Sequence, residues 1–189
     1  MAATLILARH GETDWNREQR WQGHADPELN ETGREQARAL ARSLAEDPPS
    51  AVWSSDLARS RETAEIVGRE LGLPVRLDPR LREVDVGEWS GLLWSEIEQR
   101  FPDGVERRQA GGTGWQGGER FEEMRERVEA ALCDVAAAHP GERVLVVTHG
   151  GPVVAAWLAC GGIFQERPHV SNCHVLPIRV EGRTIARIH

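Results

Sequence analysis

Two histidines in this chain each follow an apolar run and precede a glycine. Arg9 and His10 come directly after residues 5–8 (LILA), and His149 comes after residues 144–148 (VLVVT). Such runs are typical of buried strands, and ligand sites in open α/β sheets lie beyond the carboxyl ends of the strands. The two strand ends therefore predict one site that is assembled from distant parts of the sequence.

Arg59 is the third candidate for chemistry. It lies in the first turn of a predicted helix that follows a short strand, where a cation opposes the helix dipole unless an anion is nearby. Together with Arg9, His10 and His149 it forms a cationic set whose natural ligand is a phosphoryl group, because guanidinium groups bind phosphate oxygens in pairs. The helix N-termini after residues 56 and 151 are expected to add backbone N–H donors.

The composition excludes several classes of function. A net charge of −7 argues against general binding to nucleic acid, and the absence of lysine excludes a Walker-type phosphate loop and Schiff-base catalysis. Cys133, Cys160 and Cys173 lack the spacing of a zinc site and are expected to be free thiols. No signal peptide is recognisable, and we interpret residues 144–164 as strand, turn and helix rather than a membrane span. We expect a cytoplasmic protein without a membrane partner.

The elements that must position these residues alternate along the chain. Strands are predicted at 5–8, 51–54, 75–77 and 143–148, with helices between them, and this order is typical of an α/β fold with a largely parallel sheet. The helix after residue 29 is expected to be capped by Asn30, and the one after residue 55 by Asp56. No repeat or linker divides residues 1–189, so we expect a single domain.

Two regions are less informative. Residues 92–120 are predicted to be a loop-rich substrate cap with one short helix near 94–100, and nothing in them indicates a particular substrate. Residues 175–188 are predicted to form a terminal hairpin, whose free edge could pair in a homodimer.

Taken in order, the motifs resemble the histidine phosphatase superfamily, in its phosphoglycerate-mutase-like branch. The resemblance implies a three-layer sandwich, with a mostly parallel central sheet flanked by helices. The matching segments run from residue 5 to about 155 in family order. They are residues 9–13 (RHGET) with Trp15 and Asn16, Gln22-Gly23 with Asp26 and Leu29, residues 54–59 (SSDLAR) with Thr63 and Ala64, residues 81–83 (LRE) with 87–91 (GEWSG), and residues 148–151 (THGG).

The resemblance implies roles for these residues. His10 would be the nucleophile that becomes phosphohistidine, and Glu83 would protonate the leaving oxygen and then activate water, with Glu88 as a rival acid. No metal or cofactor is implied, because the arginines supply the positive charge. The non-bridging oxygens and the substrate would be held by Arg9, Arg59, His149, Asn16, Gln22, Gly23 and the Gly151 N–H. Whether Trp15, Trp21 and Trp89 line the mouth of the site or only pack stays open.

The resemblance also leaves the reaction open between two classes of enzyme. The segment 83–91 is similar to the phosphatase version, which predicts hydrolysis of a small phosphorylated metabolite. The alternatives are a cofactor-dependent phosphoglycerate mutase and a non-catalytic module that binds a phosphorylated ligand. Arg107 and Arg108 are either a solvated loop pair or a second cationic pair for a carboxylate or phosphate.

Overall fold

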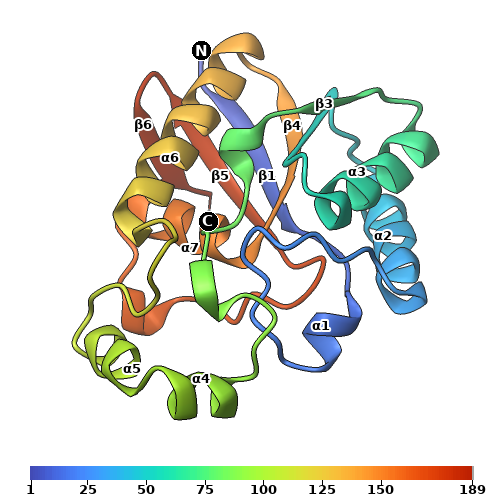
Figure 1. The fold of residues 1–189 in the computed structure, drawn as a ribbon. Coiled ribbons are helices and arrows are strands. Elements are labelled where there is room, and N and C mark those ends of the chain that lie inside the picture. Colours follow the sequence, from blue (N-terminus) through green and yellow to red (C-terminus); the bar gives the residue numbers. More distant parts are fainter. Residues whose placement is uncertain (189) are drawn as a thin grey trace.

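The computed structural model describes residues 1–188, in which a six-stranded sheet lies between two layers of helices (Figure 1). His189 lies outside the described residues. The elements are β1 (Ala3–Arg9), α1 (Asp14–Arg17), α2 (Glu31–Leu44), β2 (Ala51–Ser54), α3 (Ala58–Leu71), β3 (Val75–Leu77), α4 (Trp94–Arg100), α5 (Pro102–Gln109), α6 (Phe121–Ala138), β4 (Arg143–Thr148), α7 (Gly150–Ala159), β5 (Val175–Glu181) and β6 (Thr184–Arg187). Three short 3₁₀ turns join them at Pro79–Leu81, Gly87–Trp89 and Phe164–Glu166.

The order of strands is β3-β2-β4-β1-β5-β6. The first four are parallel, and the terminal hairpin adds β5 antiparallel to β1 and β6 antiparallel to β5. The predicted α/β class with a mostly parallel sheet is confirmed. The strand β6 lies at the edge of the sheet, and its pairing in a homodimer stays a prediction.

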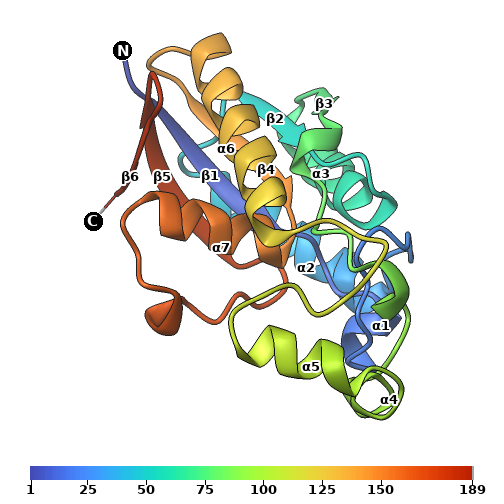
Figure 2. The ribbon, with the colours of Figure 1, turned by 60° about the vertical axis from the view of Figure 1, so that its left-hand side comes forward.

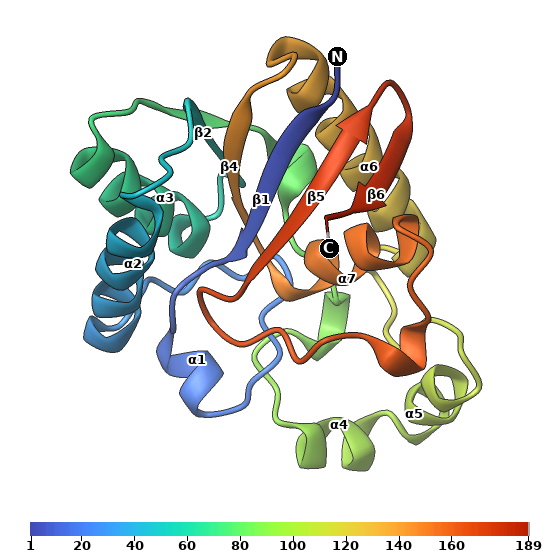
Figure 3. The ribbon, with the colours of Figure 1, turned by 180° about the vertical axis from the view of Figure 1, so that it is seen from behind.

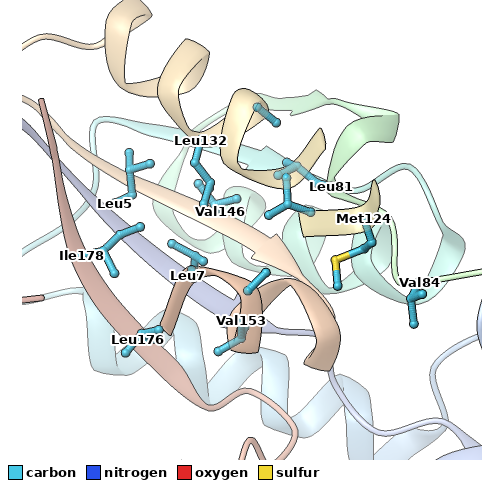
Figure 4. Close-up of a cluster of buried hydrophobic side chains, with 14 of the residues drawn as sticks. Leu5, Leu7, Leu81, Val84, Met124, Leu132, Val146, Val153, Leu176 and Ile178 are labelled. Carbon is cyan, nitrogen blue, oxygen red and sulfur yellow. The ribbon is translucent and has the colours of Figure 1, made fainter. Parts of the chain in front are cut away.

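The central strand β1 serves both faces of the sheet because its side chains alternate. Leu5 and Leu7 belong to the core beneath α6 and α7, together with Met124, Leu132 and Val153 (Figure 4). Ile6 and Ala8 belong to a second core beneath α2 and α3 on the opposite face (Figure 3). The three-layer arrangement follows from this alternation.

Parallel pairing brings the carboxyl ends of β1, β2 and β4 to one end of the molecule. Arg9 is opposite Thr148 in the register, and the His10 N–H donates to the Thr148 carbonyl over 2.9 Å. The Ser55 N–H donates to the Val147 carbonyl over 3.0 Å. The three sequence motifs therefore meet here, at the end where α1, α4 and α5 also lie (Figures 1 and 2).

Two local predictions were wrong. Asp56 does not cap α3, because it accepts hydrogen bonds from the Arg82 guanidinium, with 2.7 Å from Nε to Oδ1. The first N–H of the helix, that of Ala58, instead donates to Asp26 over 2.6 Å. Residues 92–120 hold α5 as well as the predicted α4, and they are less loop-rich than expected.

The strand-turn-helix interpretation of residues 144–164 is confirmed by β4 and the ten-residue α7. Within residues 1–188, none of the helices combines the length and the apolar character that crossing a bilayer requires.

Candidate active site

A cavity of about 840 Å³ opens at the carboxyl ends of the parallel strands. This volume suits a small organic ligand, and is far larger than a phosphoryl group alone needs. We call Arg9, His10, Arg59 and His149 the floor cluster, and Trp21, Trp94, Arg108, Trp115 and Arg167 the mouth cluster. Of the residues predicted for the site, the cavity is lined by Arg9, His10, Asn16, Gln22, Gly23, Arg59, Glu83 and Gly151.

His10 is buried with one ring nitrogen fixed. Its Nδ1 lies 2.6 Å from the Gly11 carbonyl oxygen, which can only accept a hydrogen bond, so Nδ1 carries the proton. Nε2 is left with the lone pair. Burial, followed by the charges of Arg59 and Arg9, holds the pKa of His10 well below its ordinary value. The ring is therefore neutral at pH 7 and has one nucleophilic nitrogen.

His149 lies beside His10, with 5.2 Å between the ring centroids, and it is fully buried behind the cavity wall. Its Nε2 lies 2.9 Å from the Ser55 hydroxyl and 3.2 Å from the Ser60 hydroxyl. Its Nδ1 is buried and has no hydrogen-bond partner in the described part of the chain. Burial and the Arg59 charge hold the pKa of His149 well below its ordinary value. Because a hydroxyl can donate or accept, the neutral ring can carry its proton on Nδ1.

The two arginines of the floor cluster are anchored by backbone carbonyls. Arg59 donates to Ala25 over 2.7 Å and to Gly23 over 2.8 Å, and Arg9 donates to Val170 over 2.7 Å. The Nε atoms of both arginines are buried without a partner among residues 1–188, and neither side chain makes an ion pair there. Burial lowers the pKa of Arg59 to about 10, so the group is still a cation at neutral pH. Unpaired buried cations are costly unless an anion joins them.

Glu83 is fixed at the start of α7. Its Oε1 accepts hydrogen bonds from the Gly151 N–H over 3.0 Å and from the Val84 N–H over 2.9 Å. A Cβ on Gly151 would lie 2.2 Å from that oxygen, so the contact requires glycine. The Gly151 N–H, which we had expected to face the substrate, therefore holds this carboxylate. We had expected the N-termini of α3 and α7 to bind a phosphate. Each is instead bound to a carboxylate of this chain, that of Asp26 at α3 and that of Glu83 at α7.

Asn16 and Gln22 present amide groups to the cavity. The Oδ1 of Asn16 accepts from the Thr13 N–H over 3.1 Å and from the Asn172 amide over 3.2 Å, which leaves its NH₂ group for a ligand. Gln22 is buried, and its Oε1 has no partner within residues 1–188. Gly23 acts through its carbonyl, which holds Arg59. Asn172 escaped the sequence analysis because it lies 156 residues from Asn16.

The tryptophans divide between core and cavity. Trp21 lines the cavity, whereas Trp89 is fully buried in the core and Trp15 is not part of the lining. The mouth tryptophans Trp94 and Trp115 were not predicted. Glu88 lines a separate small cavity, which removes it as a rival to Glu83.

Arg107 and Arg108 also differ in whether they line the main cavity. Arg108 lines the main cavity, with its guanidinium carbon 5.0 Å from the Trp21 ring and 5.4 Å from the Trp115 ring. Arg107 points elsewhere and donates to the Gly114 carbonyl over 3.2 Å.

Arg127 is a further residue that sequence reasoning missed. From α6 it donates to the backbone carbonyls of Arg80, Arg82 and Glu83, over 2.7 to 2.8 Å, and to both carboxylate oxygens of Glu119. It therefore ties the segment that carries Glu83 to the end of the cap. No local spacing signals this, because the carbonyls lie 44 to 47 residues away.

Comparison with known proteins gives a consistent result. Residues 5–187 match the family model described as histidine phosphatase superfamily (branch 1). Phosphoglycerate mutase-like protein 4 of Arabidopsis thaliana is 40% identical over 156 residues, which are 80% of this chain and 68% of that protein. The metal-independent phosphoserine phosphatase of the same plant is 40% identical over 159 residues, which are 82% of this chain and 67% of that protein. The structure of Bacillus stearothermophilus YhfR superposes with a TM-score of 0.88 at 34% identity, covering 98% of this chain and 95% of that one.

Proposed function

The chain belongs to branch 1 of the histidine phosphatase superfamily and is a phosphomonoester hydrolase, and from that premise we propose that it hydrolyses a small-molecule phosphomonoester, without a metal, through a phosphohistidine on His10. The observation that carries the proposal is a pair of cations without counter-ions beside His10. Arg9 and Arg59 line the cavity together with His10, and neither arginine makes an ion pair within residues 1–188. A phosphoryl group bound in the cavity would supply the missing negative charge.

In the first half of the reaction, Nε2 of His10 attacks phosphorus in line, and the bond from phosphorus to the ester oxygen breaks. The leaving oxygen takes a proton from the Glu83 carboxyl group, which lines the same cavity. Arg9, Arg59 and His149 stabilise the charge on the three non-bridging oxygens, and Asn16 adds an amide donor.

In the second half, water replaces the departed alcohol. The Glu83 carboxylate takes a proton from that water as its oxygen attacks phosphorus, and the bond from phosphorus to Nε2 breaks. Inorganic phosphate leaves, and both His10 and Glu83 return to their starting states. The Gly151 N–H keeps the carboxylate in place through both halves.

His10→Ala tests the nucleophile. We expect turnover of p-nitrophenyl phosphate to fall by at least about 1000-fold, because the covalent route is lost. Wild-type enzyme that is quenched during turnover should carry acid-labile, base-stable phosphate on residue 10, detected by mass spectrometry, and activity should survive EDTA. Appreciable turnover by His10→Ala, or phosphate on another residue, would overturn the assignment.

Phosphoglycerate mutase activity is the second candidate, because a relative at 40% identity is named mutase-like. Both activities pass through phosphohistidine, and they differ in whether water or a second alcohol accepts the phosphoryl group. Steady-state rates of phosphate release and of phosphoglycerate isomerisation, measured with and without bisphosphoglycerate, separate them. We expect hydrolysis to exceed isomerisation, and the reverse ratio would favour the mutase.

A further inference from the structure

The side-chain amide of Asn16 has a fixed polarity. Its Oδ1 accepts a hydrogen bond from the Thr13 N–H over 3.1 Å, and a backbone N–H can only donate, so this end of the amide is the oxygen. The other end, the NH₂ group, is then available to an anion. Because Asn16 lines the cavity, this orientation decides whether a bound phosphoryl group meets a donor or an acceptor.

Asn172 binds the same oxygen from a distant part of the chain. Its Nδ2 lies 3.2 Å from Oδ1 of Asn16 and 3.0 Å from the carbonyl oxygen of His10. A backbone carbonyl can only accept, so the Asn172 atom that contacts these two oxygens is its NH₂ group. The polarity of each amide is therefore set by a backbone group, and the two amides agree. Asn172 thus joins Asn16 to the backbone of His10.

The segment that carries Asn172, residues 170–174, also holds the end of β1. The His174 carbonyl accepts from the Arg9 N–H over 3.1 Å, and the Cys173 N–H donates to the Arg9 carbonyl over 3.0 Å. Cys173 has a φ of 55°, in the left-handed region that residues other than glycine rarely adopt. Such strain persists where the surrounding contacts fix it, and it is concentrated at functional sites.

We infer that Asn172 is a positioning residue, whose NH₂ group fixes the Asn16 amide so that the Asn16 NH₂ faces the bound phosphoryl group. Asn172 is not part of the cavity lining, so it acts through Asn16 and not on the substrate. When Asn172 is replaced, the His10 carbonyl keeps the Cys173 N–H, 3.4 Å away. The inference rests on the proposed function, since it assumes that the phosphoryl group binds beside Asn16.

Binding of inorganic phosphate, measured by calorimetry, tests the inference. Asn172→Leu keeps the approximate shape of the side chain and removes its donor, so we expect the Kd for phosphate to rise by about tenfold. In the Asn16→Ala background the same change should raise the Kd by less than about threefold, because the group through which Asn172 acts is already absent. An equal rise in both backgrounds would overturn the inference. A rise of less than about threefold in the single variant Asn172→Leu would also overturn it.

Two further variants complete the binding experiment, with thermal melting to verify folding. Asn172→Asp has the size of the original side chain but cannot donate when it is ionised, and it replaces Asn172→Leu if that variant does not fold. Its loss of affinity should again be larger in the wild-type background than in Asn16→Ala. Ser171→Ala is the matched control, because it truncates an exposed side chain in the same segment, and it should leave the Kd unchanged.

The orientation of Asn16 can also be observed by NMR. The chain contains three asparagines, Asn16, Asn30 and Asn172, so isotopic labelling of asparagine side chains gives three NH₂ signals, which Asn16→Ala and Asn172→Leu assign. Phosphate should shift the Asn16 signal in the wild type and spare that of Asn30, whose NH₂ donates to Glu12 over 2.9 Å. The shift should be largely lost in Asn172→Leu. An Asn16 signal that ignores phosphate in the wild type, or that responds fully in Asn172→Leu, would overturn the inference.

These readouts do not depend on the covalent step. If His10→Ala retained turnover, the phosphohistidine would be rejected, whereas the response of Asn16 to phosphate would still decide the role of Asn172. Conversely, unchanged phosphate binding in Asn172→Leu would reject the role of Asn172 even if p-nitrophenyl phosphate is hydrolysed through His10.

Discussion

The floor cluster and the mouth cluster share one cavity but are held by different interactions. Arg9 is the last residue of β1, and His10 and His149 directly follow β1 and β4. Arg59 lies in the first turn of α3, which follows β2. Backbone pairing in the sheet therefore sets their positions. The mouth cluster comes from loops, α4, α5 and the segment after α7, and ring stacking between side chains sets its geometry.

This difference assigns different tasks to the two regions. Phosphoryl transfer needs donors that do not reorganise, and groups fixed by a sheet register meet that need. Substrate selection needs surfaces that can differ between relatives without disturbing the sheet, and a stacked cap provides them. The floor cluster should therefore set the rate for every substrate, and the mouth cluster should set the ratio between substrates.

We expect the largest effect on activity from a substitution in the floor cluster. Arg59→Met should lower kcat/KM by about 100- to 1000-fold for every phosphomonoester, because it removes a preset donor to the transferring group. The measurement is steady-state hydrolysis of p-nitrophenyl phosphate and of glycerol 3-phosphate, with thermal melting to verify folding. Arg108→Gln is the comparison and should leave p-nitrophenyl phosphate nearly unaffected. Similar losses from both variants would break the distinction between the regions.

Gly151→Ala should have the next largest effect. Its Cβ would overlap Oε1 of Glu83, so the carboxylate must leave its position. Because general acids contribute about 100- to 10,000-fold, we expect glycerol 3-phosphate hydrolysis to fall by about 10- to 100-fold. p-Nitrophenyl phosphate, whose leaving group needs no proton, should lose less.

Gly150→Ala is the matched control for this variant. A Cβ there would lie 3.7 Å from Oε2 of Glu83, an ordinary contact, so activity should stay close to wild type. If Gly151→Ala slowed both substrates equally, the acid role of Glu83 would lose its support.

The same contrast explains what the sequence could predict. The residues of the floor cluster lie at the ends of recognisable strands or in the first turn of a helix. Once the parallel order of the strands is known, the strand register places their motifs at the same edge of the sheet. Asp56 failed as a cap because two partners distant in sequence, Arg82 and Asp26, changed the local preference. Capping rules consider only neighbours along the chain.

The structure of the cap, residues 92–120, could not be predicted for a related reason. The segment of α5 contains Pro102 and Gly104, which favour a loop, yet Gly104 permits close packing, because a Cβ there would meet the Gly114 carbonyl at 2.5 Å and Trp89 at 3.3 Å. The orientation of Arg108 depends on Trp21, far away in the sequence. Such contacts have no signature in local spacing.

Arg127→Met tests the connection between the two regions. The change removes three hydrogen bonds to carbonyls of residues 80–83 and the pair with Glu119, so the free energy of unfolding should fall by about 2 kcal/mol. Urea unfolding measures it. The control is Arg120→Met, which removes an exposed pair at the N-terminus of the same helix and should cost less than about 0.5 kcal/mol. Equal costs would mean that Arg127 is an ordinary surface residue.

Acidification should act on the floor cluster and spare the mouth cluster, whose charges are arginines that do not titrate. His10 and His149 have folded-state pKa values well below the ordinary 6.5, because burial and the floor arginines oppose their protonation. As the pH falls below 6.5, the unfolded chain therefore binds protons that the folded chain does not, and stability declines. Asp56 and Asp78, whose pKa values are lowered, contribute only at more acidic pH.

The expected result is a smaller dependence of the free energy of unfolding on pH in the histidine variants than in the wild type. Wild type and Arg108→Gln should lose the same stability between pH 7.5 and 5.5 in urea titrations, and His10→Asn should lose less because one buried titrating ring is gone. His149→Asn should behave like His10→Asn, since both rings are shielded from water and face the same arginines. A full wild-type slope in both histidine variants would place the acid sensitivity elsewhere. It would also mean that protonation of His10 or His149 costs less free energy than burial beside the cations Arg9 and Arg59 implies.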